Sequence, residues 1–331
     1  MKMYNLFIDG GTTYTRFTLM DQETIVAREE YKIGAGDAAH PEENEELESM
    51  VGRVICNMQQ THGCRIEEIY ASGMITSNIG ICEVPYVKAP ADVSDLARGM
   101  MMKQINTQDG WKTVCFVPGI SFSNKDGYVM DVMRGEEVEI IGGLKQYNMT
   151  GNVMFVHFGS HNKMIYCQEQ KICESVTTIS GELVWAVLNE TILRSSALAC
   201  EDESQMDDDF IRLGYQNACR VGLSRALFMA RILHTQEGAG GRQITSYIYG
   251  ALTCEDIKAF SELLKKKADH FILYGRSCFI RAFSVCLKLY DSGIRGEMVK
   301  MTFDGSEGLS VQGMGLIAKQ SRLEKEKEGV I

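Results

Sequence analysis

The sequence of 331 residues predicts an α/β protein built from two similar halves, each with the element order βββαβα. Two repeated patterns support this prediction. The first triplet of apolar, strand-like segments is expected at 3–9, 15–20 and 24–32. The second is expected far downstream, at 153–157, 164–167 and 171–177. In both triplets a glycine-containing turn follows the first strand and a helical segment follows the third, which indicates a duplication.

The first turn, Asp9-Gly10-Gly11-Thr12-Thr13, has the residue types that bind a phosphate. The two glycines allow the backbone to approach a ligand closely. The two hydroxyls lie beside backbone N–H groups, a combination suited to anions. Asp9, at the end of the strand, could hold Mg²⁺ through water. An ordinary glycine-rich hairpin is the alternative for this turn taken alone.

The second turn, Gly159-Ser160-His161-Asn162-Lys163, follows the first strand of the second triplet. If the two halves face each other across a cleft, both turns can bind one nucleotide, so we expect phosphate contacts at this turn. Lys163 would neutralise charge on the phosphates or bind a substrate carboxylate. His157 and His161 are four residues apart, but a strand and its turn do not place them on one face, so no metal pair is predicted.

Length and composition are those of a soluble protein with two domains. We expect domains at 1–145 and 146–307, with a C-terminal helix from about 308 to 331 that packs on the first. The net charge of −10 and the absence of a basic stripe argue against nucleic-acid binding. No apolar run is long enough to cross a membrane. No signal-peptide pattern is present, so a cytoplasmic protein is expected.

Eleven cysteines occur, none spaced as C-x-x-C, which predicts buried free thiols rather than a metal or disulfide framework. The run Asp207-Asp208-Asp209 is interpreted as the start of a helix rather than as a metal site. The remaining expected helices are 42–60, 182–195, a long one at 210–234, 247–267 and 278–290, with a glycine-rich linker at 236–242. Strands are expected at 66–71, 113–117, 271–275 and 297–303.

An ordered series of motifs resembles the 2-keto-3-deoxygalactonate kinases, a family of the sugar kinase, heat-shock ATPase and actin superfamily. The most specific match is Asp131-Val132-Met133-Arg134-Gly135-Glu136-Glu137. The other matches are 9–13, 73–77, 83–86, 118–121, 159–163, 180–183, 247–256 and 305–309. The resemblance implies duplicated ribonuclease H-like (actin-like ATPase) domains with an interdomain cleft.

The resemblance also implies a reaction. The γ-phosphate of ATP would pass to the terminal (C6) hydroxyl of a 2-keto-3-deoxy sugar acid, in the first place 2-dehydro-3-deoxy-D-galactonate, giving the 6-phosphate for aldol cleavage. ATP and Mg²⁺ are the expected cofactors, with Asp9 orienting the metal. The turn residues Gly11, Thr12, Thr13, Gly159, Ser160, His161 and Lys163 would bind ATP. The resemblance places the adenine near Gly275, although tight packing explains a glycine there equally well.

Two acids are candidates for the catalytic base. Asp131 and Glu136 are expected on either side of a helix start, and Asp131 is slightly favoured. The alternative is that these acids only cap the helix and pair with Arg134. The residues expected to bind the sugar acid are Arg16, Ser77, Asn78, Glu83, Tyr86 and Arg134.

Three departures from the family pattern bear on the acceptor. Gly10, Ile81 and Met164 stand where the family has aromatic residues. Their loss would widen or reshape the acceptor pocket, so a different sugar acid is one alternative. A non-catalytic nucleotide or sugar-acid sensor on the same fold is another. The sequence leaves the oligomeric state open, with a homodimer as one option.

Overall fold

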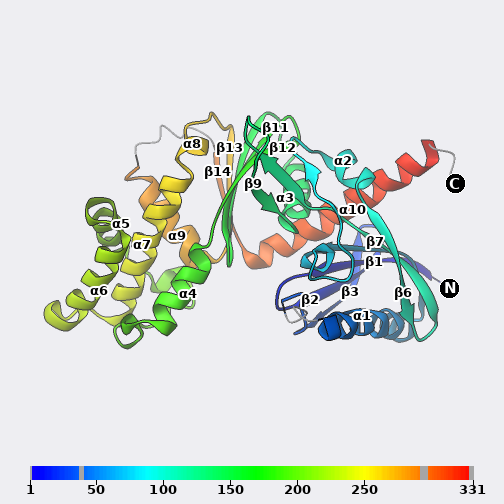
Figure 1. Ribbon diagram of the computed structural model, residues 1–331, viewed down its shortest axis with the longest axis horizontal. Coiled ribbons are helices and arrows are strands. Elements are labelled where there is room, and N and C mark those ends of the chain that lie inside the picture. The colour runs from blue at the N-terminus through cyan, green and yellow to red at the C-terminus, as the bar shows by residue number, and fades with distance from the viewer. Residues whose placement is uncertain (1, 37–40, 291–296, 328–331) are drawn as a thin grey trace. The chain divides into compact units, whose positions relative to one another are not determined.

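A computed structural model describes residues 2–36, 41–290 and 297–327, with side chains described outside 41–44 and 297–307. The chain divides into two compact units (Figure 1). Unit 1 contains residues 1–149, 170–173 and 307–331, and unit 2 contains residues 150–169 and 174–306.

The main sheet of unit 1 has the strand order β3-β2-β1-β4-β7-β6 (Figure 1). Its strands are β1 (Lys2–Gly10), β2 (Thr15–Asp21), β3 (Thr24–Tyr31), β4 (Cys64–Gly73), β6 (Met101–Thr107) and β7 (Gly110–Phe116). The first three are antiparallel neighbours, whereas β4 runs parallel to both β1 and β7. Helix α1 (Pro41–His62) connects β3 to β4, and its apolar stripe, including Val51 and Ile55, is buried against Leu6, Ile8 and Phe17. The predicted strand triplet and amphipathic helix are therefore confirmed.

A second, smaller sheet in unit 1 has the order β5-β8-β9 and was not predicted. It contains β5 (Val87–Lys88), β8 (Ile120–Ser123) and β9 (Val129–Met133). These strands are too short to give a clear periodic pattern, which explains why the sequence did not reveal them. Short helices η1 (Met74–Thr76) and α2 (Val93–Arg98) lie between β4 and β6 in the chain.

Helices α3 (Glu136–Gln146) and α10 (Phe303–Lys327) pack closely in unit 1. Gly142 and Gly313 make the approach possible, because a Cβ at either position would lie 2.0 or 1.8 Å from the carbonyl oxygen of Leu309 or Val138. Helix α10 begins at residue 303, a few residues before the predicted start near 308.

Unit 2 repeats the strand order of unit 1, with the sheet β12-β11-β10-β13-β14 (Figure 1). Its strands are β10 (Asn152–Phe158), β11 (Asn162–Gln168), β12 (Lys171–Thr178), β13 (His270–Gly275) and β14 (Glu297–Thr302). The parallel pairs β10–β13 and β13–β14 correspond to β1–β4 and β4–β7. This shared order confirms the predicted duplication.

Helices fill the long connection between β12 and β13 (Figure 1). They are α4 (Ser180–Glu190), η2 (Ile192–Ser195), η3 (Glu203–Gln205), α5 (Asp208–Val221), α6 (Leu223–Glu237), α7 (Gly241–Ala259) and α8 (Ser261–Leu264). Helix α9 (Ser277–Leu287) follows β13. The expected helix at 182–195 ends at Glu190 and continues only as the 3₁₀ turn η2.

Two predictions for this region were wrong. The long helix at 210–234 is two helices, because Gly222 adopts φ +83°, a conformation that ends α5. The glycine-rich linker at 236–242 is reduced to residues 238–240, since α7 begins at Gly241 rather than near 247. The interpretation of Asp207 as a helix start is confirmed, as its carboxylate accepts from the N–H groups of Asp209 and Phe210.

Among the described residues, no helix is long and apolar enough to cross a membrane. All eleven cysteines are free thiols, most of them buried or partly buried. The prediction of free cysteines is confirmed, although Cys219 is exposed.

Candidate active site

The first turn connects β1 to β2 and is held from behind by the segment after β3. The N–H of Gly11 donates to the carbonyl oxygen of Tyr14 at 2.8 Å. The carbonyl oxygens of Gly11 and Thr12 accept from the N–H groups of Ala35 and Gly36, at 3.0 and 2.8 Å. The turn therefore directs its carbonyl groups toward residues 35 and 36.

The N–H groups of this turn are available to a ligand. Thr12 and Thr13 are exposed, and their N–H groups donate to no acceptor within the part of the chain that the structure describes. Each of these two residues also carries a hydroxyl beside its N–H group. This is the donor set that the sequence predicted for a phosphate.

Two glycines behind the first turn were missed by the sequence analysis. A Cβ at Gly34 would lie 2.3 Å from the carbonyl oxygen of Thr12, and a Cβ at Gly36 would lie 2.5 Å from the Thr12 methyl. Only glycine therefore permits this packing. The signal was present in the sequence, as two glycines in three residues directly after a strand.

Asp9 and Arg16 face each other across β1 and β2. The register pairs Asp9 with Arg16, and Arg16 in turn with Glu30 on β3. The Arg16 guanidinium lies 3.6 Å from the Asp9 carboxylate and 2.6 Å from the Glu30 carboxylate. Arg16 thus neutralises two acids of its own sheet, which competes with the predicted role of binding a substrate carboxylate.

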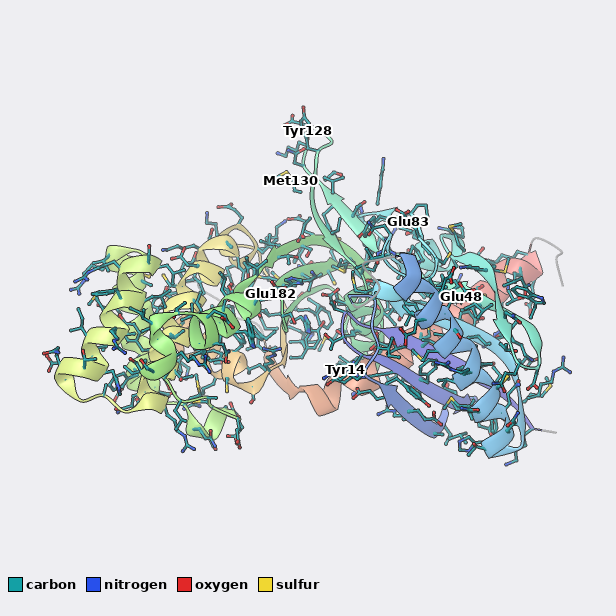
Figure 2. All side chains as sticks on the ribbon, turned by 60° about the horizontal axis from the view of Figure 1, so that its bottom comes forward. Tyr14, Glu48, Glu83, Tyr128, Met130 and Glu182 are labelled. Atoms are coloured by element: carbon teal, nitrogen blue, oxygen red, sulfur yellow. The ribbon has the colours of Figure 1, made fainter. Side chains whose placement is uncertain are left out.

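The second turn, residues 159–161, connects β10 to β11 and rests on the start of α4. The carbonyl oxygen of Ser160 accepts from the N–H of Glu182 at 3.0 Å. The imidazole of His161 lies 2.9 Å from the carboxylate of Glu182, which Figure 2 labels on α4. A Cβ at Gly181 would lie 2.0 Å from the carbonyl oxygen of Gly159, so the helix start and the turn are in close backbone contact.

The second turn also offers N–H groups. Ser160 and His161 are exposed, and their N–H groups have no acceptor among the residues described. Lys163, predicted to contact phosphate, is only 5% exposed and lies on β11, where the register pairs it with His157. The two turns therefore occupy equivalent places in the two sheets and present equivalent donors.

Gly275 ends β13 next to the end of β10. It adopts φ +112°, and a Cβ there would lie 2.2 Å from the carbonyl oxygen of Phe158. The glycine is therefore required by its own backbone and by the neighbouring strand, which is the packing explanation weighed in the sequence analysis. The structure brings Gly275 beside Phe158 and hence beside the second turn.

The two candidate bases lie on different elements of unit 1. Asp131 is on strand β9, opposite Phe122 and before the start of α3. Glu136 is the first residue of α3, and its carboxylate accepts from the N–H of Arg134 at 3.3 Å. A third acid, Glu137, was not singled out by the sequence analysis.

Glu137 is fully buried, and its Oε2 accepts from the N–H of Gly135 at 2.7 Å. Its Oε1 has no hydrogen-bond partner among the described residues. Burial, together with the nearby Glu136, raises the pKa of Glu137 to about 8. A carboxyl with a pKa in this range carries its proton over most of the neutral range.

Arg134 holds together the loop that follows β4. Its Nη1 donates to the carbonyl oxygen and to the hydroxyl of Thr76, both at 2.6 Å. Its Nη2 donates to the carbonyl oxygen of Val84 at 2.8 Å. The guanidinium carbon lies 4.2 Å from the centre of the Tyr86 ring, a cation–π arrangement. These contacts fix both ends of residues 76–84 to Arg134, two residues before the start of α3.

The other predicted acceptor residues are distributed along this loop. The Ser77 hydroxyl is 2.7 Å from the carbonyl oxygen of Met74, so it serves its own 3₁₀ turn. Asn78 and Glu83 are exposed, and Tyr86 is 40% exposed. Figure 2 shows Glu83 at the surface of unit 1. Of the motif at 305–309, residues 305–307 lie outside the described side chains.

The donor set fits the groups that the sequence analysis expected. Each turn, taken by itself, has free N–H groups and a hydroxyl that suit a phosphate. The Asp9 carboxylate, with 36% of its side chain exposed, can take a hydrated Mg²⁺. Mg²⁺ bound through one carboxylate and the substrate phosphates does not need a cluster of three acids, and the described residues contain none.

Comparisons with known proteins point to one family of sugar-acid kinases. A family model described as 2-keto-3-deoxy-galactonokinase matches residues 9–306. The chain is 22% identical over 214 residues to the 2-dehydro-3-deoxygalactonokinase of Escherichia coli K12, covering 64% of this chain and 68% of that protein. It is 24% identical over 189 residues to a probable 2-dehydro-3-deoxygalactonokinase of Rhizobium meliloti, covering 55% and 59%.

A solved structure covers nearly the whole chain. The crystal structure of a Sinorhizobium meliloti protein, which carries the provisional name 2-dehydro-3-deoxygalactonokinase, superposes with a TM-score of 0.74 at 18% identity. The match covers 97% of this chain and 99% of that one. This likeness confirms the fold class predicted from the sequence.

Proposed function

Because the chain belongs to the 2-keto-3-deoxy-galactonokinase family, we propose that it transfers the γ-phosphate of ATP to the C6 hydroxyl of 2-dehydro-3-deoxy-D-galactonate. The product would be the 6-phosphate, a substrate for aldol cleavage. The observation that supports the proposal most directly is the pair of equivalent turns with unused N–H groups, at Thr12 and Thr13 and at Ser160 and His161. Phosphoryl transfer depends mainly on positioning and on neutralising charge, which such turns supply.

Each turn is proposed to contact nucleotide phosphate. The first turn would donate to phosphate oxygens through Thr12 and Thr13, and the second through Ser160 and His161. Glu182 holds the His161 ring at the second turn. Mg²⁺, when bound with the phosphates, would neutralise part of their charge, and Asp9 is the residue that would hold it through water.

The base is proposed to be Asp131, with Glu136 as the alternative. A base must reach the attacking hydroxyl, and both acids are partly buried rather than sealed in the core. Each acid accepts one backbone N–H, Asp131 that of Val132 and Glu136 that of Arg134, but only Glu136 does so from the first turn of a helix, which favours a capping role for it. Asp131→Asn should therefore lower kcat by at least about a hundredfold, whereas Glu136→Gln should lower it by less than about tenfold. The reverse order would assign the base to Glu136.

The acceptor is proposed to bind at the loop 76–86. Asn78 and Glu83 are exposed polar residues of this loop, and Tyr86 stacks on Arg134 beside it. Arg134 uses both Nη groups on Thr76 and Val84, so its proposed contribution is to hold the loop in place rather than to bind the acid directly. The family has aromatic residues where this chain has Gly10, Ile81 and Met164. Their loss is proposed to change which sugar acid the acceptor pocket accepts.

The test is ADP release with ATP and Mg²⁺ against a panel of 2-keto-3-deoxy sugar acids and plain hexoses. Turnover with 2-dehydro-3-deoxy-D-galactonate well above the other acceptors is the expected result. Turnover with another keto acid would retain the kinase and correct its substrate. Nucleotide binding without turnover on any acceptor would overturn the proposal in favour of a sensor.

A further inference from the structure

The buried carboxylate of Asp256, on α7, connects the elements that carry the second turn. Its Oδ2 accepts from Nδ2 of Asn162 at 2.8 Å. Its Oδ1 accepts from the hydroxyls of Thr178 at 2.6 Å and Ser180 at 2.5 Å. These partners belong to β11, β12 and α4, so one side chain joins four elements.

Each partner of Asp256 adjoins the second turn or its support. Asn162 is the first residue of β11, directly after the turn. Ser180 is the first residue of α4, next to Gly181, whose backbone is in close contact with the carbonyl oxygens of Gly159 and Ser160. Asp256 therefore fixes both the end of the turn and the helix start on which the turn rests.

The position of Asp256 is unfavourable for a carboxylate. It has no exposed surface, and this burial raises its pKa. It also lies in the last turn of α7, where the helix dipole disfavours negative charge. Well-packed apolar residues in place of Asp256 and its polar partners together would stabilise such a site as well or better. A gain in folding stability alone therefore does not explain this carboxylate, whereas a geometric role does.

We propose that Asp256 is a positioning residue that holds the N–H groups of Ser160 and His161 in the geometry that binds a nucleotide phosphate. The inference rests on the kinase function proposed above. It gives a role to the motif 247–256, which the proposed function does not otherwise use, and to Ser180 of the motif 180–183. Asp256 does not touch the nucleotide in this scheme and acts through Asn162 and Ser180.

The first test removes the carboxylate. Asp256→Ala should weaken ADP binding, measured by titration calorimetry, by roughly tenfold or more. In steady-state assays the KM for ATP should rise similarly, while the KM for the acceptor stays within about twofold. Thr253→Val is the matched control, because Thr253 is buried on the same helix and its hydroxyl has no partner among the described residues. The control should leave ADP binding unchanged.

The second test exchanges the two partners and remains informative if Asp256→Ala fails to fold. Asn162→Asp alone places two carboxylates in contact at the 2.8 Å pair and should weaken ADP binding. Adding Asp256→Asn restores one amide and one carboxylate at that contact. The double variant should therefore bind ADP within about threefold of the wild type.

The outcomes separate the inference from the proposed function. Wild-type protein that binds no ADP would overturn the kinase proposal, and this inference with it. Wild-type binding with equal affinity in Asp256→Ala, or no rescue in the double variant, would overturn the positioning role alone. A parallel rise in both KM values would show a general structural effect and would also overturn it.

Discussion

Replacing Glu137 with glutamine should make the protein more stable at pH 8 while leaving its stability near pH 4.5 unchanged. Glu137 is fully buried at the start of α3, and burial raises its pKa from 4.5 to about 8. The glutamine amide has nearly the same shape as the protonated acid. Its oxygen can accept from the N–H of Gly135, as the carboxyl does.

The sign and size of the effect follow from proton linkage. Between pH 4.5 and 8 the unfolded chain has lost a proton that the folded chain keeps, so stability falls as pH rises. Each pH unit across this range costs about 1.4 kcal/mol. The Glu137 contribution is then at most roughly 5 kcal/mol at pH 8, and it becomes constant above that. Glutamine does not titrate, so it removes this slope.

The assay is urea unfolding at a series of pH values for wild type and Glu137→Gln. Urea keeps the ionic strength constant, and the difference in unfolding free energy should grow from about zero to several kcal/mol. Glu139→Gln is the control, since Glu139 is in the same first turn but only partly buried. Parallel stability curves for wild type and Glu137→Gln would refute a raised pKa at Glu137.

Three further predictions concern the turns and the loop. Gly275→Ala should lower the free energy of unfolding by roughly 3 kcal/mol, because it combines a strained φ with a clash against Phe158. Gly222→Ala, which has a similar φ of +83° but open space around it, should lower it by about 1 kcal/mol, and equal losses would contradict the packing argument. Arg134→Lys should raise the KM for the acceptor roughly tenfold with little change in the KM for ATP, since one ammonium cannot replace the guanidinium's contacts to both Thr76 and Val84. An unchanged KM for the acceptor would show that Arg134 does not hold the loop that binds it. Asp9→Asn should lower kcat by about a hundredfold while ADP binding measured without Mg²⁺ stays unchanged. Normal turnover in this variant would show that Asp9 does not hold the metal.

The parts of the fold that could be predicted are those with strong local patterns. The strands around the two turns alternate or are continuously apolar, and α1 has a full apolar stripe, so both were found near their observed bounds. The break at Gly222 could not be predicted, because a single glycine within a helical pattern is often tolerated. The strands β8 and β9 are too short to show a period.

The candidate site was predictable only where it is local in sequence. Each turn is a short run whose residue types indicate phosphate binding, and the structure places those runs on exposed hairpin ends. Glu137 and Asp256 carry no such signal. Asp256 meets Asn162 from 94 positions away and Ser180 from 76, so its burial and its partners depend on tertiary packing. The pattern of apolar residues around Glu137 or around Asp256 gives no information about these contacts.

Gly73 and Gly275 show why a glycine after a buried strand is weak evidence for a ligand. Both end the strand that runs parallel to the turn-bearing strand of their unit, and both have positive φ, +84° and +112°. A Cβ would lie 2.6 Å from the carbonyl oxygen of Gly10 in one case and 2.2 Å from that of Phe158 in the other. Since the same requirement recurs in both sheets, the fold itself accounts for Gly275. A glycine at this position therefore follows from the packing of two parallel strands and is not by itself an indication of an adenine contact.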